Sequence, residues 1–535
     1  MKFNSRRSPV YGLHGMVATS QPLASMVGIE MLKKGGNAAD AAVGVAAALN
    51  MTEPCSTGIG GDVFCLYFDS STKDVKGLNA SGRAPASLTL DHLNSLGFTS
   101  RLPSTSPHTV TVPGAAAGWV DTLEKFGSLE VEDVLAPAIK LGEEGFPVSP
   151  ITARSWGRGI PKLRTGPHFG ELLIDGKAPR AGEIWRNKNL ANTFKEVVDH
   201  GKAGFYEGRV AEEIVKVLDP MGGVMTLDDL KNHSNTFPKP ITTNYKGLDV
   251  YEIPPNGQGI TALIALNILE EYDFSETPHG STEHLHTLIE AMRLAFADTR
   301  WYVADPDVTD VPIMELISKE YAAKRRALID PLKASVDVLR GSPVAGSDTV
   351  YFCVVDMEGN ACSFIASNYA GFGTGIIPKG CGFTLQNRGS GFSLDPDHPN
   401  CLEPNKRPYH TIIPGMLARD GELYAPFGVM GGFMQPQGHT QVVVNMVDYG
   451  MNPQMALDAG RFCILDGTSG GKVHVEDEIG VDVMSELSGM GHEIVPSSGW
   501  RRGYFGRGQI IHRNPETGVL TGGSDPRADG CVIPW

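Results

Sequence analysis

The sequence changes in character at residue 349, and this change limits the possible folds more than any other feature. Residues 349–356 (TVYFCVVD) and 361–367 (ACSFIAS) are rich in β-branched and aromatic side chains, and a short turn containing Gly359 separates them. This pattern predicts a β-hairpin. Further strands and one helix are predicted after it: the strands cover 382–385, 411–417, 422–426, 508–512 and 519–522, and the helix covers 435–448.

The part of the chain before residue 300 has mostly helical patterns. Residues 23–49 predict two helices, because Gly35 and Gly36 end the first and Asn37 is a favourable N-cap for the second. A chain of 535 residues predicts a large layered domain or two lobes, here an α+β fold with sheets sandwiched between helices. Apolar residues recur with a helical period in six more segments: 115–126, 131–145, 191–200, 210–218, 261–271 and 283–300.

The charge balance and the N-terminus bear on partners and location. The net charge is −15, from 46 basic and 61 acidic residues, and no run of Lys and Arg forms a basic stripe, so nucleic acid is not an expected partner. No apolar stretch is long enough to predict a membrane span. Ser8, Pro9, His14 and Gln21 interrupt what would be the apolar core of a signal peptide. We therefore expect a cytoplasmic protein.

The sequence predicts neither a metal nor a cofactor. The eight cysteines are scattered and form no C-x-x-C pair, so free, mostly buried thiols are expected. His284 and His286 are two positions apart and would point to different faces of a helix, whereas zinc proteases place histidines four apart. The glycines at 58–61 precede a strand rather than a helix, which excludes a phosphate loop. No serine-hydrolase elbow is present.

Two short segments could carry chemistry. A small, flexible run ends at Asp348, directly before a strand that starts with Thr349. Gly431 and Gly432 lie between a strand and a helix, where two successive N–H groups could form an oxyanion hole. An ordinary strand start and an ordinary tight turn are the alternatives, and the residues alone leave both open.

Ten segments spread in order over nearly the whole chain carry a family resemblance. They are GMVATSQPLAS, LKKGGNAADAAVG, STGIGGD, VTVPGAAAGW, EAMRLAFAD, SDTVYFCVVDMEGNACSF, GFGTGI, NKRPYHT, GGFMQPQGH and GGSDPRADG. The chain resembles the gamma-glutamyltransferase (glutathione hydrolase) family. The resemblance implies the N-terminal-nucleophile hydrolase fold, a four-layer αββα sandwich. It also implies self-cleavage between Asp348 and Thr349 into a large fragment, 1–348, and a small one, 349–535, which associate in one intertwined domain. A higher oligomer stays open.

The implied chemistry begins with an N-terminal threonine. Cleavage would turn the nitrogen of Thr349 from an amide into an amine with an unperturbed pKa of roughly 7.7–8.0, suited to a general base. By resemblance, the Thr349 hydroxyl is the nucleophile and Ser367 occupies the place of a second threonine that bonds it. Gly431 and Gly432 match the glycine pair whose N–H groups stabilise the oxyanion.

The residues that would bind the glutamyl group depart from the family pattern. The position of the family arginine is Ser81, with Arg83 displaced by two, and the position of an asparagine is Tyr369. Residues 386–391 contain no acidic side chain where the family has acids, and the lid segment 393–405 is short. These differences remove the recognition of a free α-amino group and leave the pocket more open.

The same departures predict an anionic acyl group. Arg83, Arg388, His410 and Thr411 are the candidate substrate contacts, with His410-Thr411 standing where the family has two serines. Structural ion pairs are the alternative role for the charged members of this set. The pattern is similar to a divergent branch of the family that includes cephalosporin acylases and oxamate amidohydrolase.

The leading hypothesis is therefore a self-processing amidohydrolase or acylase that acts on small amides. The first alternative is a glutathione hydrolase or gamma-glutamyltransferase that reads its substrate with different residues. The second is an unprocessed protein that uses the fold only for binding.

Overall fold

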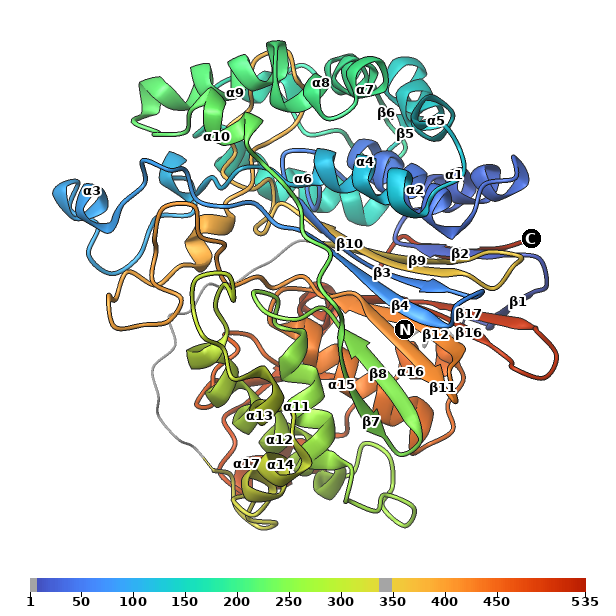
Figure 1. Cartoon of the computed structure of the whole chain (residues 1–535). Helices are drawn as coiled ribbons and strands as arrows, with labels where there is room; N and C mark the ends of the chain where they lie inside the picture. Colours follow the sequence, from blue (N-terminus) through green and yellow to red (C-terminus); the bar gives the residue numbers. More distant parts are fainter. Residues whose placement is uncertain (1–6, 336–348) are drawn as a thin grey trace.

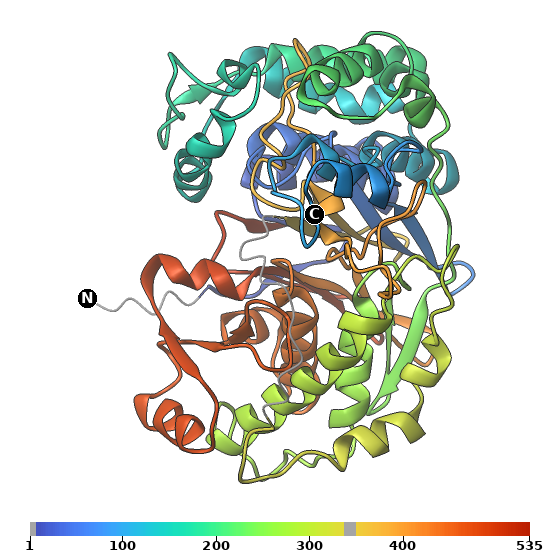
Figure 2. The same ribbon diagram turned by 90° about the vertical axis from the view of Figure 1, so that its left-hand side faces the viewer.

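The computed structural model describes residues 7–335 and 349–535, and it consists of two stacked β-sheets between two layers of helices (Figures 1 and 2). Asp348, the first residue of the predicted cleavage site, lies outside the described residues. The layers confirm the predicted α+β sandwich.

The first sheet has six strands, and its neighbours are all antiparallel. The predicted hairpin lies in it as β9 and β10, which confirms the sequence pattern. The order is β18 (Cys531–Pro534), β2 (Met16–Thr19), β9 (Val350–Val355), β10 (Ala361–Ser367), β3 (Asp62–Asp69) and β4 (Asp74–Ala80).

The second sheet has seven antiparallel strands. Its order is β1 (Val10–Gly12), β17 (Leu520–Ser524), β16 (Arg507–Arg513), β12 (Glu422–Met430), β11 (Gly415–Arg419), β8 (Leu248–Glu252) and β7 (Ile241–Tyr245). Each sheet thus takes strands from both sides of residue 349. Cleavage at that point would leave two interleaved chains rather than two separable lobes.

The strands at the centre are buried on both faces, which explains their continuous apolar sequence. In β9, Val350 and Phe352 belong to the core under the helices, whereas Tyr351 and Cys353 belong to the core between the two sheets. Successive side chains in a strand point to opposite faces. Thr349, one residue before β9, therefore has the same parity as Tyr351 and faces the space between the sheets.

One helical layer covers the six-stranded sheet and the other covers the seven-stranded sheet. The first contains α1 (Pro22–Lys33), α2 (Ala38–Thr52), α4 (Ala115–Phe126), α5 (Val131–Glu144), α6 (Pro150–Leu163), α7 (Lys188–His200), α8 (Ala203–Tyr206), α9 (Arg209–Leu218) and α10 (Leu227–Lys231). The second contains α11 (Gly259–Leu269), α12 (Thr282–Tyr302), α13 (Ile313–Leu316), α14 (Lys319–Arg326), α15 (Met434–Val447), α16 (Pro453–Asp458) and α17 (Val481–Gly489).

The smaller elements lie at the margins. They are α3 (Leu90–Ser95), the two-stranded sheet β5 (Phe146–Pro147) and β6 (Ile184–Trp185), and a three-stranded sheet of β13 (Phe462–Ile464), β14 (Val473–Glu476) and β15 (Ile494–Ser497). No helix in the described ranges has the length and apolarity needed to cross a bilayer.

Most predicted elements are confirmed, although the strand predicted at 411–417 begins only at Gly415. Asn37 caps α2 through a capping box with Asp40, as its position suggested. The strand predicted at 382–385 is wrong: Gly382 has φ 75°, and Leu385 bonds to a neighbouring loop at Ile376 instead of a strand. The eight cysteines all lie in the described ranges and form no disulfide there, and all except Cys531 are buried.

Candidate active site

Thr349 and Ser367 meet at the open end of the β9–β10 hairpin. Both are fully buried, and the Oγ1 hydroxyl of Thr349 donates a 3.0 Å hydrogen bond to the Oγ of Ser367. The backbone N–H of Tyr369 donates to the same Oγ at 2.8 Å. The strand register creates this contact, because Ala366 pairs with Val350 and brings the next residue on each strand to the same end.

The backbone of Thr349 is held from the other sheet. The guanidinium of Arg507, the first residue of β16, donates to the carbonyl oxygen of Thr349 at 3.3 Å. A second nitrogen of Arg507 donates to Glu53 at 2.6 Å, and that carboxylate is buried. Sequence reasoning missed both residues, although a charged residue at the start of an apolar strand was a detectable signal.

Gly431 and Gly432 follow β12 and precede α15. Their φ values are 135° and 59°, which only glycine adopts without strain. Met430, the residue before them, pairs with Arg507, so the contact of Arg507 with Thr349 brings the glycine pair to the same region. Neither glycine N–H donates a hydrogen bond to any residue in the described ranges. Two unengaged N–H groups in a glycine turn suit an oxyanion hole.

Gln258 connects the glycine pair to Thr411, one of the candidate substrate contacts. Its side-chain amide donates to the carbonyl oxygens of Gly432 at 2.8 Å and Thr411 at 2.6 Å. Its Oε1 accepts from the hydroxyl of Tyr409 at 3.0 Å. Nothing in the sequence singled out this buried glutamine.

Asp62 and His410 form a buried pair next to the nucleophile. Nε2 of His410 donates to Oδ2 of Asp62 at 3.0 Å, and the backbone N–H of Ile412 donates to Nδ1 at 3.3 Å. Burial, aided by the nearby Arg388, lowers the pKa of His410 to about 3, so the imidazole is neutral at physiological pH. Both ring nitrogens of His410 are thus engaged within the protein.

Arg388 has a different environment. Its side chain is fully buried, and Nη1 donates to the hydroxyl of Thr411 at 2.7 Å, but Nε and Nη2 have no hydrogen-bond partner among the described residues. Burial lowers its pKa to about 10, which still leaves it protonated at neutral pH. Buried polar groups without partners are rare in folded proteins. These two donors are therefore suited to a bound anion.

Tyr369 links Arg388 to the nucleophile. The ring of Tyr369 lies 4.4 Å from the Arg388 guanidinium carbon, while its N–H bonds Ser367. Its φ of 74° is unusual for a residue with a side chain, and such strain concentrates at functional sites. One strained residue thus connects the hydroxyl pair with the guanidinium of Arg388.

Arg83 lies in a separate ion pair. Its guanidinium contacts Asp307 at 3.2 Å and the carbonyl oxygen of Ser234 at 3.2 Å. Ser81, at the position of the family arginine, instead donates to Asn79 at 2.8 Å in a buried neutral network. The structure therefore brings together Arg388, His410 and Thr411 but not Arg83.

The residues named in this site offer no cluster of metal ligands. Within the described ranges, one group of side chains could hold a metal ion, and it consists of His286, Glu290 and His492 in the other helical layer.

The comparison with known proteins identifies the family. The sequence profile of gamma-glutamyltranspeptidase matches residues 24–535. The chain belongs to this family. It is 39% identical to the glutathione hydrolase-like YwrD proenzyme of Bacillus subtilis (strain 168), over 98% of this chain and 99% of that protein. It is 31% identical to the oxamate amidohydrolase proenzyme of Klebsiella pneumoniae, over 97% of this chain and 98% of that one.

A solved structure agrees with the sequence match. The crystal structure of cephalosporin acylase from Bacillus halodurans is similar with a TM-score of 0.93 and 44% identity, covering 100% of this chain and 98% of that one. The chain therefore has the N-terminal-nucleophile hydrolase fold. It is an amidohydrolase or acyltransferase of the gamma-glutamyltranspeptidase family.

Proposed function

We propose that the chain is a precursor that cleaves itself between Asp348 and Thr349 and then hydrolyses small amides through an ester on Thr349. The observation that carries this proposal is the 3.0 Å hydrogen bond from the buried Thr349 hydroxyl to Ser367. Two relatives that cover nearly the whole chain are named proenzymes, which supports processing. The interleaved sheets support fragments that stay associated after cleavage.

The proposed reaction uses the new amine as the base. The α-amine of Thr349 accepts the Oγ1 proton as that oxygen attacks the amide carbonyl of the substrate. The N–H groups of Gly431 and Gly432 stabilise the oxyanion, while Ser367 keeps the nucleophile oriented. The leaving amine takes the proton and departs, and an ester remains on Thr349. Water attacks the ester and releases the acid; an amine acceptor would give acyl transfer instead.

The substrate is proposed to carry a carboxylate on its acyl group, bound by Arg388. Two donor nitrogens of a buried guanidinium, Nε and Nη2, have no acceptor among residues 7–335 and 349–535 and match the two oxygens of a carboxylate. The third nitrogen of that guanidinium, Nη1, donates to the hydroxyl of Thr411. Both ring nitrogens of His410 are already bonded within the protein, so we assign His410 no direct contact with the substrate. Its proposed role is to hold the carboxylate of Asp62 in position. Arg83, the fourth candidate, is a suitable control for Arg388, because its charge is already paired with Asp307.

The processing half of the proposal is tested by intact mass spectrometry of the purified chain, with N-terminal sequencing of any small fragment. We expect two fragments, the smaller beginning Thr349-Val350-Tyr351, and one uncleaved chain from Thr349→Ala. That variant should also lose amidase activity by at least about 10³-fold. Fragments from Thr349→Ala would refute the nucleophile. One stable, inactive wild-type chain would favour the binding-only alternative.

The substrate half is tested with three matched anilides. Glutaryl-p-nitroanilide carries the terminal carboxylate, pentanoyl-p-nitroanilide lacks it, and gamma-glutamyl-p-nitroanilide adds an α-amino group to the glutaryl chain. We expect the highest kcat/KM for the glutaryl compound, because no acidic side chain of residues 386–391 is available to bind an amino group. A preference for the gamma-glutamyl compound would favour the glutathione hydrolase alternative.

A further inference from the structure

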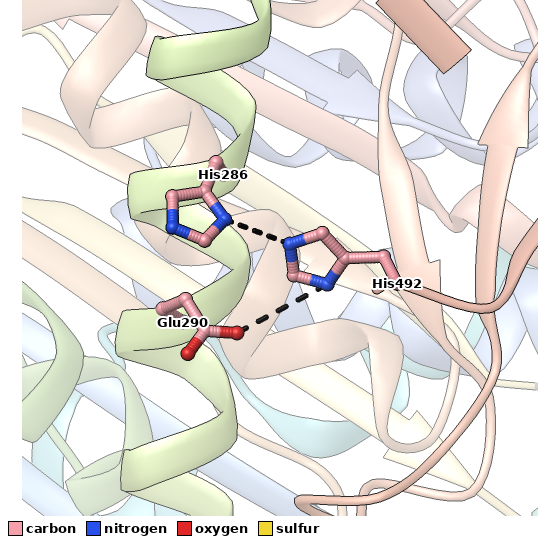
Figure 3. A group of neighbouring side chains, drawn as sticks. All are labelled: His286, Glu290 and His492. Carbon is pink, nitrogen blue, oxygen red and sulfur yellow. Dashed lines mark hydrogen bonds and ion pairs between the residues drawn. The ribbon is translucent and has the colours of Figure 1, made fainter. Parts of the chain in front are cut away.

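Three ionisable side chains from distant parts of the sequence meet in the helical layer that covers the seven-stranded sheet (Figure 3). His286 and Glu290 lie one turn apart on α12, and His492 follows the end of α17. All three are buried, with exposed fractions of 1%, 0% and 3%. One ligand atom from each lies within 4.8 Å of the others.

Hydrogen bonds join the two histidines to the backbone and to each other. Nε2 of His286 donates to the carbonyl oxygen of Asp330 at 2.8 Å, since a carbonyl only accepts. Nδ1 of His286 and Nε2 of His492 share a 2.8 Å hydrogen bond. Nδ1 of His492 lies on the other side of its ring.

The second nitrogen of His492 faces Glu290. Nδ1 of His492 lies 4.0 Å from Oε1 of Glu290, and neither atom has a hydrogen-bond partner in the described part of the chain. The other oxygen of Glu290 accepts from the N–H of Ser335 at 2.9 Å. Buried polar atoms without partners are rare, and a buried carboxylate is stabilised by a cation bound to it. Oε1 of Glu290 is therefore available to bind a cation.

The surrounding charges do not exclude a divalent ion. Nε of Arg293 lies 3.7 Å from Oε1 of Glu290, while its two terminal nitrogens donate to the carbonyl oxygens of Ser469 and Gly471. Asp466 is close enough to Arg293 to interact with its charge. Glu290 and Asp466 together outweigh Arg293 by one negative charge. A divalent ion would leave a single net positive charge, which one bound hydroxide could cancel.

We propose that His286, Glu290 and His492 bind one divalent metal ion of the zinc type. Two imidazoles and one carboxylate form a ligand set that zinc accepts, with bonds of about 2.0–2.2 Å. The ligand atoms would be Nδ1 of His286, Nε2 of His492 and Oε1 of Glu290, with the proton of His492 on Nδ1. Tetrahedral coordination requires the two imidazole nitrogens to move from 2.8 Å apart to about 3.4 Å, a small shift of the two rings. Water or hydroxide would fill the fourth position. In the metal-free protein, the hydrogen bond between the rings replaces the metal bonds.

The site would join the two sides of the proposed cleavage point. His286 and Glu290 precede Thr349, and His492 follows it. The same residues hold the stretch just before residue 336, through Asp330 and Ser335. Metal binding would thus stabilise the association of the two fragments. The site itself does not depend on the proposed function, because the same three residues meet in an uncleaved chain.

The test uses the full-length protein as purified, stripped with a chelator and then dialysed against Zn²⁺. Metal content is measured by mass spectrometry of the metal, and the unfolding temperature is measured with and without Zn²⁺. We expect about one zinc per chain and a rise in unfolding temperature on binding. His492→Asn and Glu290→Gln should lose both effects. His474→Asn, which changes another partly buried histidine of the same region, should keep them.

A second measurement uses only the wild-type protein, so it stays informative if a variant does not fold. Co²⁺ added to the stripped wild-type protein should give the intense visible bands of a tetrahedral site, and Zn²⁺ should displace it. Wild-type protein that binds no zinc above the level of a control protein, or that gives only the spectrum of aqueous Co²⁺, would overturn the proposal. Zinc that binds equally to His492→Asn would also overturn it. Intact mass spectrometry separates this outcome from a failure of self-processing.

Discussion

Ser367 and Asp62 lie directly opposite each other across β10 and β3. Residues opposed in this way place their side chains on the same face of a sheet. The Ser367 hydroxyl, which accepts from Thr349, and the Asp62 carboxylate, which accepts from His410, therefore lie side by side on one face of the six-stranded sheet. This single register connects the nucleophile to the residues around Arg388.

Removing the Ser367 hydroxyl should impair catalysis without abolishing the nucleophile. Ser367→Ala leaves the Thr349 hydroxyl and the Tyr369 N–H without their shared acceptor. A lost buried hydrogen bond costs roughly 1–3 kcal/mol, so we expect kcat/KM to fall by about 5- to 150-fold. Ser367→Thr should restore most of the activity. A loss of stability with unchanged kcat/KM would contradict the positioning role.

Replacing Arg388 should affect anionic and neutral substrates differently. Arg388→Met removes a buried charged donor, which is worth roughly 1.5–3 kcal/mol. We expect kcat/KM for the glutaryl anilide to fall by about 10- to 150-fold, with little change for the pentanoyl anilide. Arg83→Met is the matched control and should change either value by less than about 3-fold, since Arg83 lies in a partly exposed ion pair. Equal losses on both substrates would remove the role assigned to Arg388.

The rate should depend on pH through the α-amine of Thr349. This amine must be unprotonated to act as base, and its ordinary pKa is roughly 7.7–8.0. We expect kcat/KM to rise up to tenfold per pH unit below that value and then level off. The pKa of His410, about 3, and that of Arg388, about 10, lie outside this range, so neither accounts for the rise. A flat profile between about pH 5 and pH 9 would contradict an amine base.

The buried His410 should make the fold sensitive to acid. Burial lowers the pKa of His410 from 6.5 to about 3. As the pH falls below 6.5, this histidine is therefore protonated in the unfolded chain but stays neutral in the folded chain. This contribution to the unfolding free energy is complete above pH 6.5 and is lost as the pH falls towards 3. Between about pH 7.5 and pH 5 the loss amounts to roughly 2 kcal/mol.

Chemical denaturation at those two pH values isolates the contribution of His410. The drop in the unfolding free energy should be smaller by that amount in His410→Asn than in the wild-type protein. Other buried histidines, such as His284 and His492, also have pKa values lowered by burial, so part of the drop should remain in the variant. Identical drops in the two proteins would show that His410 is protonated in the folded state.

The local elements were predictable because each one depends on nearby residues. Asn37, Gly35 and the turn around Gly359 give capping and turn signals within a few positions, and the structure has α1, α2 and the β9–β10 hairpin there. The strand predicted at 382–385 failed because Gly382 adopts a positive φ and the segment follows a neighbouring loop. Sheet order was not predictable, since β2 and β18 pair across nearly the whole chain.

The candidate site was only partly accessible from the sequence. Thr349, Ser367, Gly431 and Gly432 carry motifs, and the structure joins the first two by a hydrogen bond. Asp62, Gln258 and Arg507 carry no motif, and their contacts depend on pairing between strands and loops that are far apart in the chain.

The sequence by itself determined the helices, the hairpin that starts at Thr349 and the set of charged candidates, because periodicity, capping and turn chemistry are local. Only the tertiary structure decided which charges are already satisfied. Arg83 and His410 find partners in the protein, whereas Arg388 keeps two buried donor nitrogens that no described residue accepts from. It also decided that His286, dismissed with its neighbour on spacing, meets Glu290 and His492. Side-chain partners depend on contacts between distant segments, which chain order does not encode.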